Sequence, residues 1–368
     1  MMIFFKVLFF IYLIMVFLFL IGWFKNNSQI DRSDYKLSVI IAVRNEEKNI
    51  LRLIKNLKSQ DYDNNLYDVI IIDDHSEDNS WKILVEQASL WSNLIVLKQD
   101  PQLSGKKMAI LKGVKESNSD IILTTDADCS FNKNWLTRMS SYFKNEKINL
   151  VSGPVNYKSS NSFFKKIQTL EFLSLIGSAA GAIGINKPIL CNGANLAYRK
   201  KIFLEINNYE SDDIVSGDDV FLLHSVKKRF PNSILFAKNQ DAVVLTDAVN
   251  NISNFFNQRI RWSAKSIHYK DVDSILVALI VFLTNLSMII LGISSCFKSE
   301  IFNQLILLFL VKTFIDFVFL IPVLLFFNRQ GLIKWIFPLQ LVYPFYITLT
   351  SIFSNFIHFH WKGRKRNL

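Results

Sequence analysis

The sequence predicts an α/β domain with a mostly parallel sheet, joined to membrane-spanning α-helices, and three observations indicate this fold class. The chain has 368 residues and half of them are hydrophobic, which suffices for one domain of about 100–200 residues and several membrane segments. Long apolar runs stand near both ends. Between them, short continuous apolar runs alternate with segments of helical spacing, as in a parallel sheet covered on both faces.

Residues 1–25 are expected to form the first element, a transmembrane helix. This stretch is apolar for over twenty positions, interrupted only by Lys6. It is longer than a signal-peptide core and no small-residue cleavage site follows it, so we expect an anchor. Lys25, Arg32 and Lys36 follow this helix, against Lys6 before it. The excess predicts that the next domain faces the cytoplasm.

Residues 26–274 are predicted to form a polar domain of alternating strands and helices. Strands are expected at 36–43, 67–73, 93–98 and 120–125, and helices at 44–59, 81–91 and 105–117. No Gly-x-Gly-x-x-Gly string follows the first strand, and the chain has no P-loop. Both absences argue against a dinucleotide dehydrogenase and a P-loop ATPase.

Polar residues follow three of the expected strands. They are Arg44, Asn45 and Glu46 after the first strand, Asp73 and Asp74 after the second, and Asp126 and Asp128 after the fourth. The carboxyl ends of parallel strands meet at one edge of a sheet, and such folds bind their ligands there. We therefore expect these side chains to converge.

Asp126 and Asp128 stand one residue apart at the end of a buried strand. Carboxylates suit Mg²⁺ or Mn²⁺, which commonly bridge a protein and substrate phosphates. Such an ion would offset charge on a departing diphosphate. Two other Asp-x-Asp strings, at 61–63 and 271–273, follow no buried strand. The alternative for Asp126 and Asp128 is a turn or a helix cap, where Asp is common.

Gly217, Asp218 and Asp219 precede an amphipathic helix. Acids in a first helical turn suit the helix dipole, which is one explanation for them. The functional alternative makes one of the two acids a general base within reach of an acceptor hydroxyl.

Gln258, Arg261 and Trp262 are spaced i, i+3 and i+4, so they share one face of a helix predicted at 251–266. Arg pairs well with phosphate oxygens, and Trp offers a flat face to a sugar or a nucleobase. The alternative is an interfacial helix just ahead of the membrane, where both residue types are common.

Residues 275–358 are expected to form about three membrane helices, and 359–368 a basic tail. Lys312 and Asp316 fall inside the second of these three helices, and we expect them to pair within the bundle. The net charge of +11 and the cations beside Trp361 favour anionic lipid headgroups over nucleic acid as a partner. Three crossings would leave the tail outside, against the charge rule, so one segment is alternatively re-entrant or interfacial.

Residues 161–184 show a helical apolar pattern with small residues at its end. One interpretation is a core helix. The other is an interfacial helix that guides a lipid acceptor, because two phenylalanines and two lysines at 163–166 suit a headgroup layer.

Five strings in this order resemble the family 2 glycosyltransferases, and more closely their membrane-bound members with cellulose-synthase-like motifs. The strings are VIIAVRNEE, VIIIDDHSED, TTDAD, GDD and QRIRW. The resemblance covers residues 36–262 and extends to GKKMAILKG and CNGANLAYRK, which look like the family's lysine segment and its glycine–asparagine segment near the sugar. It implies a GT-A fold and transfer from a nucleotide sugar with inversion at the anomeric carbon.

The resemblance also implies roles for the matching residues. The donor nucleotide would be held by Arg44, Asn45, Glu46, Asp73, Asp74, Lys106 and Asp126, with Asp128 as the main ligand of a Mg²⁺ or Mn²⁺ ion beside Asp126. The diphosphate, sugar and acceptor end would lie at Gly193, Asn195, Gln258, Arg261 and Trp262. Asp219 would be the base. Asp218 stands where polysaccharide synthases usually carry Glu, so it stays an alternative.

We therefore expect an integral protein of a bacterial inner membrane whose catalytic domain faces the cytoplasm. It would be a metal-dependent, inverting hexosyltransferase that moves a sugar, usually carried on uridine diphosphate, to a lipid, lipid-linked or polysaccharide acceptor. A processive polysaccharide synthase is the alternative, disfavoured by the few spans after the domain. A catalytically silent scaffold is disfavoured because every acid is retained, and a nucleotidyltransferase because of the Gln-x-x-Arg-Trp string.

Overall fold

A computed structural model describes residues 2–26, 34–206, 218–354, 359–361 and 364–366 of the chain. Its contacts divide the chain into two compact units. The sheet unit comprises 26–158 and 190–247, and the helical unit comprises 1–25, 159–189 and 248–368. The helix that follows residue 251 therefore groups with the apolar helices. The domain boundaries expected from the sequence stay a prediction.

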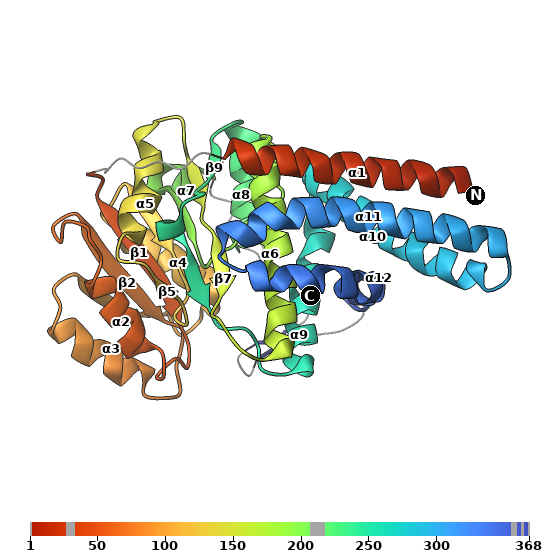
Figure 1. The fold of residues 1–368 in the computed structure, drawn as a ribbon. Helices are drawn as coiled ribbons and strands as arrows, with labels where there is room; N and C mark the ends of the chain where they lie inside the picture. The colour runs from red at the N-terminus through yellow and green to blue at the C-terminus, as the bar shows by residue number, and fades with distance from the viewer. Residues whose placement is uncertain (1, 27–33, 207–217, 355–358, 362–363, 367–368) are drawn as a thin grey trace. The chain divides into compact units, whose positions relative to one another are not determined.

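The described strands of the sheet unit form a large mixed sheet and a small one (Figure 1). The large sheet has the order β3(Leu94–Lys98), β2(Tyr67–Asp73), β1(Leu37–Val43), β4(Ile121–Thr124), β8(Leu196–Arg199), β6(Leu150–Ser152), β9(Ile234–Phe236). Strands β3, β2, β1 and β4 are parallel, and β8 is antiparallel to both β4 and β6. The small sheet has the order β5(Ser130–Phe131), β10(Val244–Thr246), β7(Val155–Tyr157).

Helices cover the large sheet, which explains why its strands are continuous apolar runs. The helices of this unit are α2(Ile50–Lys58), α3(Ser80–Ser89), α4(Lys106–Glu116), α5(Trp135–Ser141), α7(Lys200–Ile206) and α8(Asp218–Arg229). Ile40 and Ile72 of the central strands are fully buried. A Cβ at Gly113 of α4 would lie 2.5 Å from the Ile40 side chain and 2.7 Å from that of Ile72. Glycine thus lets α4 pack directly on the sheet.

The helical unit contains α1(Met2–Lys25), α6(Phe163–Gly184), α9(Ile252–Ala264), α10(Val272–Ser295), α11(Ser299–Phe326) and α12(Ile336–Phe353). Among the described residues, five helical stretches are long and apolar enough to cross a membrane: Met2–Lys25, Phe163–Gly184, Val272–Ser295, Ser299–Phe326 and Gln330–Phe353. Four correspond to the expected spans, and the fifth is α6. In the tail, β11(Phe359–Trp361) pairs antiparallel with β12(Arg364–Arg366).

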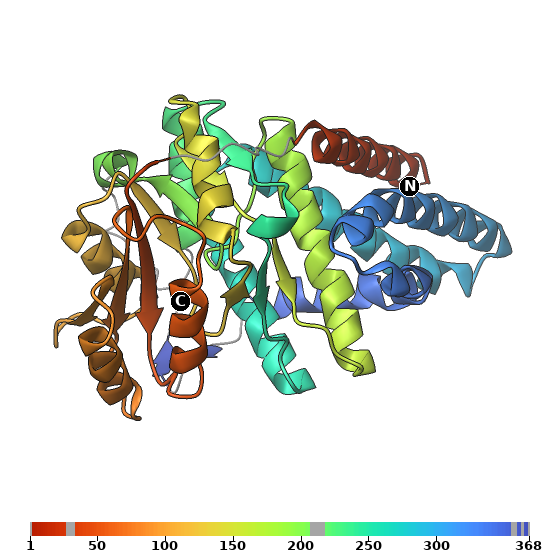
Figure 2. The same cartoon turned by 60° about the vertical axis from the view of Figure 1, so that its left-hand side comes forward.

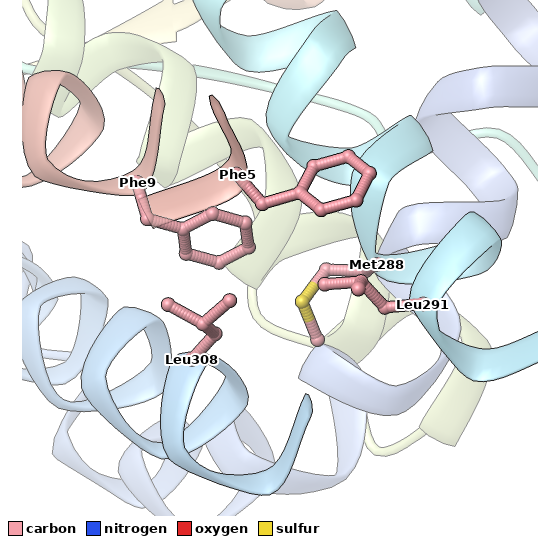
Figure 3. Packing of buried hydrophobic residues seen from close by; sticks show 5 residues of the cluster. All are labelled: Phe5, Phe9, Met288, Leu291 and Leu308. Carbon is pink, nitrogen blue, oxygen red and sulfur yellow. The ribbon is translucent and has the colours of Figure 1, made fainter. Parts of the chain in front are cut away.

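Apolar side chains from three helices form a core inside this unit (Figure 3). Phe5 and Phe9 of α1 pack with Met288 and Leu291 of α10 and with Leu308 of α11. Burying such side chains stabilises a packed unit, here through segments that stand almost 300 residues apart in sequence.

Most residues of α6 are buried inside the helical unit, as in a core helix, and its part as an interfacial helix that guides a lipid acceptor stays a prediction. It meets α1 through glycines, and both views of the ribbon show the two helices crossing near their C-terminal ends (Figures 1 and 2). A Cβ at Gly22 would collide with the carbonyl of Gly181, and a Cβ at Gly184 with that of Gly22. Small residues allow this close approach of two backbones.

A buried polar cluster joins three membrane helices and confirms the expected pair. Lys312 donates to Asp316 at 2.8 Å and to Gln340 of α12 at 2.7 Å. Tyr12 of α1 donates to the other Asp316 oxygen at 2.7 Å. Charged groups inside a membrane bundle are costly unless they pair in this way.

Candidate active site

The loop after β1 is bonded to the loop after β2. The Arg44 guanidinium donates to the carbonyl oxygens of Asp74 at 3.0 Å and His75 at 2.9 Å. Asn45 has a φ of +54°, and its side chain accepts the backbone N–H of Glu77 at 2.9 Å. A left-handed backbone is one that Asn tolerates better than most residues. These residues thus shape the β2 loop.

Asp73 and Asp74 end β2 and are both buried. One Asp74 oxygen accepts the backbone N–H of Gly105 at 3.0 Å, which fixes the start of α4. One Asp73 oxygen accepts the N–H of Ser76 at 3.3 Å. Its other oxygen, Oδ1, is buried and has no hydrogen-bond partner among the described residues. Since an unpaired buried oxygen is costly, Asp73 is suited to accept a hydrogen bond from a ligand.

Four segments bring cationic and acidic groups together around Gly193. The Lys106 ammonium at the start of α4 donates to Asp126 at 2.6 Å. The backbone N–H of Gly193 donates to the Asp219 carboxylate at 2.9 Å. A Cβ at Gly193 would lie 3.3 Å from the Cβ of Asp219 and 3.5 Å from the Lys106 nitrogen. The predicted residues Lys106, Asp126, Gly193 and Asp219 therefore meet in one place, and glycine leaves room between them.

Asp128 is held at three points by residues that the sequence analysis missed. The Thr246 hydroxyl donates to the Asp128 carboxylate at 2.9 Å. The Asp128 carbonyl oxygen accepts from Arg52 at 3.0 Å and from Lys158 at 3.5 Å. Asp247, which follows Thr246, pairs with Lys158 at 2.7 Å. Thr246 ends a three-residue strand, too short to be recognised as a sequence pattern.

The charge around Asp128 suits a bound cation. Burial raises the pKa of the Asp128 carboxyl above its usual value, and the negative charges of Asp126 and Glu46 raise this pKa further. A divalent ion would offset this accumulation of negative charge. No group of three or more His, Cys, Asp or Glu side chains that could hold a metal occurs among the described residues. Two carboxylates still fit Mg²⁺ or Mn²⁺, because such an ion keeps waters and binds substrate phosphates.

Asn195 is held by protein groups on both ends of its amide, and its role near the sugar stays a prediction. It is fully buried. Its amide nitrogen donates to the carbonyls of Pro154 at 2.9 Å and Ala242 at 2.8 Å, while its oxygen accepts from the Trp135 indole at 3.0 Å. Protein groups thus occupy all of its amide hydrogens. Asn195 joins the segments that carry the two sheets, and Gly193 stands two residues before it.

The remaining predicted residues belong to the helical unit or to a segment that the structure describes only in part. Gly217 is not among the described residues, and for Asp218 only its place at the start of α8 is described. Gln258, Arg261 and Trp262 lie on α9 in the helical unit, where a helix was expected. The site built from the sheet unit is therefore described without them.

Comparisons with known proteins add to this geometry. Residues 38–206 match the family model described as glycosyl transferase family 2. The chain is similar to glycosyltransferase AglE of Haloferax volcanii, with 28% identity over 50% of this chain and 59% of that protein. It is similar to a beta-monoglucosyldiacylglycerol synthase of Nostoc sp., with 36% identity over 31% of this chain and 25% of the other.

A third relative is a poly-beta-1,6-N-acetyl-D-glucosamine synthase of Staphylococcus aureus, with 24% identity over 62% of this chain and 53% of that protein. The chain thus spans less than two thirds of the length of these curated relatives. Among solved structures, a mannosyltransferase from Pyrobaculum calidifontis in complex with GDP-Man and Mn²⁺ superposes with a TM-score of 0.58 and 14% identity. That alignment covers 96% of this chain and 98% of the other. The likeness shows the fold, which is GT-A.

Proposed function

We propose that the chain transfers a sugar from a nucleotide sugar to a lipid or lipid-linked acceptor at a membrane, since residues 38–206 match the family 2 glycosyltransferase model. The observation that carries this proposal is the meeting of Lys106, Asp126, Gly193 and Asp219 from four separate segments. A lysine, an acid for the donor and a second acid for the acceptor are the groups that sugar transfer needs.

The donor would bind along the ends of β1, β2 and β4. The buried, unpaired oxygen of Asp73 would accept a hydrogen bond from the base or the ribose. Lys106 would face the diphosphate beside Asp126, with which it now pairs. Asp128, with Asp126, would hold a Mg²⁺ or Mn²⁺ ion, which supplies positive charge to the departing nucleoside diphosphate.

Asp219 would act as the base. Its carboxylate is held by the N–H groups of Gly193 and Val220, both at 2.9 Å, so its direction is fixed before the acceptor arrives. The carboxylate takes the acceptor hydroxyl proton while that oxygen bonds to the anomeric carbon. The bond from that carbon to the diphosphate oxygen breaks from the opposite face, and this inverts the configuration. Asp218 is the alternative base.

The acceptor is proposed to be a lipid or a lipid-linked glycan of the cell envelope. Two relatives bear names that describe the synthesis of a glucosyldiacylglycerol and of a polysaccharide. Five described stretches are able to cross a membrane. We favour transfer of one or a few sugars over processive synthesis. The excess of cations after α1 favours an inner membrane with the sheet unit in the cytoplasm.

Release of nucleoside diphosphate by the detergent-purified chain tests this function. A panel of nucleotide sugars is offered with Mn²⁺ or Mg²⁺ and a lipid extract. We expect metal-dependent release with one donor, lost in Asp128→Asn and in Asp219→Asn. Asp63→Asn is the matched control, because Asp63 ends the exposed Asp-x-Asp string at 61–63 and should be dispensable. Release of inorganic pyrophosphate would indicate nucleotidyl transfer, and no release from folded protein would favour the scaffold alternative.

A further inference from the structure

Arg259 lies between the motif residues Gln258 and Arg261, and it is a charged residue of α9 that is buried, as Ile260 and Ala264 are. Its Nε contacts both oxygens of Glu171 at 3.1 Å, and its terminal nitrogen forms a further bond to the same carboxylate. The Tyr346 hydroxyl donates to Glu171 at 3.0 Å. Glu171 belongs to α6 and Tyr346 to α12, so one ion pair joins three helices of the helical unit.

The same guanidinium also contacts two motif side chains. It donates to the Gln258 amide oxygen at 2.5 Å. It lies 4.3 Å from the ring centre of Trp262 and 4.6 Å from that of Phe255. Trp262 also contacts Phe172 of α6, and the centres of these two rings are 6.0 Å apart. The orientations of Gln258 and Trp262 therefore both depend on where the Arg259 guanidinium is held.

Stability alone is a weak reason for this arrangement. The side chains of Arg259 and Glu171 are only 3% and 5% exposed, and burying two charges costs free energy that their attraction often does little more than repay. Apolar residues of similar volume would pack three helices at least as well. What an ion pair with several bonds adds is a fixed geometry, because the planar guanidinium accepts few orientations against a carboxylate.

We propose that Arg259 is a positioning residue, held by Glu171 and Tyr346, that fixes Gln258 and Trp262 for sugar transfer. Helices α6 and α12 of the helical unit would in this way set the geometry of the Gln-x-x-Arg-Trp segment. This inference rests on the proposed function and on the roles at the diphosphate, sugar and acceptor end that the family resemblance implies for Gln258 and Trp262.

Three variants separate positioning from packing. Glu171→Gln removes one charge, Arg259→Lys keeps the charge without the planar fork, and the double variant Glu171→Leu with Arg259→Met replaces the pair by apolar volume. The position of Trp262 is followed by acrylamide quenching of its fluorescence, taken as the difference from Trp262→Phe in each background. Thermal unfolding in detergent reports folding, and nucleoside diphosphate release gives kcat and the KM for the donor.

We expect the double variant to unfold at or above the temperature of Glu171→Gln, because it leaves no unpaired buried charge. Its Trp262 should nevertheless be more accessible to acrylamide, and its kcat should fall about 100-fold with little change in KM, as misplacement of a group needed in the transition state would produce. Arg259→Lys should recover part of this loss. The exposed pair of Arg229 and Glu205 gives the control, since Arg229→Met should change neither quenching nor kcat.

A folded double variant with the quenching and kcat of the unmodified chain would overturn the inference, because packing alone would then account for the pair. The proposed function fails in a different way, through an unmodified chain that releases no diphosphate from any donor. In that case the quenching of Trp262 still decides whether Arg259 fixes its position.

Discussion

At the scale of single residues, the orientation of Asp128 depends on groups more than a hundred positions away. Thr246 fixes one carboxylate oxygen of Asp128 at 2.9 Å, while the other oxygen accepts a long contact of 3.8 Å from the Cys129 thiol. Groups that orient a metal-binding carboxylate in this way commonly change metal affinity about 10–100-fold when they are removed.

Thr246→Val should therefore weaken Mn²⁺ binding by about 10-fold or more, because the valine has the same shape but no hydroxyl. Titration of the purified chain with Mn²⁺, followed by electron paramagnetic resonance of the unbound ion, measures the dissociation constant directly. Thr246→Ser keeps the hydroxyl and should bind Mn²⁺ nearly as the unmodified chain does. Equal affinity in the valine and serine variants would remove Thr246 from the site.

Gly193→Ala should lower kcat about tenfold, because the added methyl group would lie 3.3 Å from the Asp219 Cβ and must displace the proposed base by a few tenths of an ångström. Thermal unfolding should change little. Gly331→Ala is the control, since a Cβ there meets no atom within 4 Å. Unchanged turnover in Gly193→Ala would mean that this space is not used by the reaction.

At the scale of elements, two sets of contacts connect segments that are distant in sequence. Asn195 ties the segment before β8 to the backbone around the small sheet. Gly22, Gly181 and Gly184 allow α1 and α6 to touch backbone to backbone. The first contact depends on hydrogen bonds of one side chain and the second on the small size of glycine. A single substitution at either place should therefore lower the stability of the protein to unfolding.

Asn195→Asp should destabilise the sheet unit by about 3 kcal/mol or more, because a buried carboxylate would face two carbonyl oxygens that now receive N–H groups. Thermal unfolding monitored by circular dichroism measures the loss. Asn65→Asp, at an exposed position, should unfold like the unmodified chain. A normal unfolding temperature for Asn195→Asp would show that these hydrogen bonds contribute little.

Gly181→Val should separate α1 from α6, because its side chain would meet the Phe19 backbone. Overpacking of this kind costs about 1–3 kcal/mol, and the unfolding temperature in detergent should fall accordingly. Gly292→Val makes the same change in α10, where a Cβ meets no atom within 4 Å. If both variants unfold alike, the close approach of α1 and α6 has no energetic importance.

At the scale of the whole molecule, the sequence predicts the fold class well because the parallel strands are buried apolar runs such as Val69–Ile72. It leaves α6 ambiguous, because polar residues such as Glu171 interrupt its apolar pattern. The structure explains them: Glu171 is paired with Arg259, a residue 88 positions away. Motif residues Lys106, Asp126 and Asp219 meet as expected, whereas Thr246 was missed because no local pattern marks a partner 118 residues distant.

The chain path also limits how the molecule crosses a membrane. Both ends of α6 lead into the sheet unit, so a single crossing by α6 would put parts of one compact unit on opposite sides. We therefore expect α6 to stay within the helical unit without crossing. With α10 as a true span, the turn at Cys296 should lie on the side opposite the sheet unit.

A membrane-impermeant maleimide tests this topology. In Asp63→Cys, we expect the new thiol to react only in inverted membrane vesicles and the exposed Cys296 only in right-side-out ones. Cys129 and Cys191 are buried and should react with neither. Labelling of both engineered and native exposed thiols from the same side would contradict the assignment of α10 as a span.

The glycine contact between α1 and α6 has a consequence for biosynthesis. The α1 helix is made first and ends at residue 25, while α6 ends at residue 184. At about 5–20 residues per second, the ribosome needs roughly 10–30 s to supply the second helix after the first. During that interval the surface of α1 around Gly22 is uncovered, and a large part of the sheet unit is made before the partner arrives. Chaperones or neighbouring membrane proteins that recognise this surface would meet the nascent chain in this window.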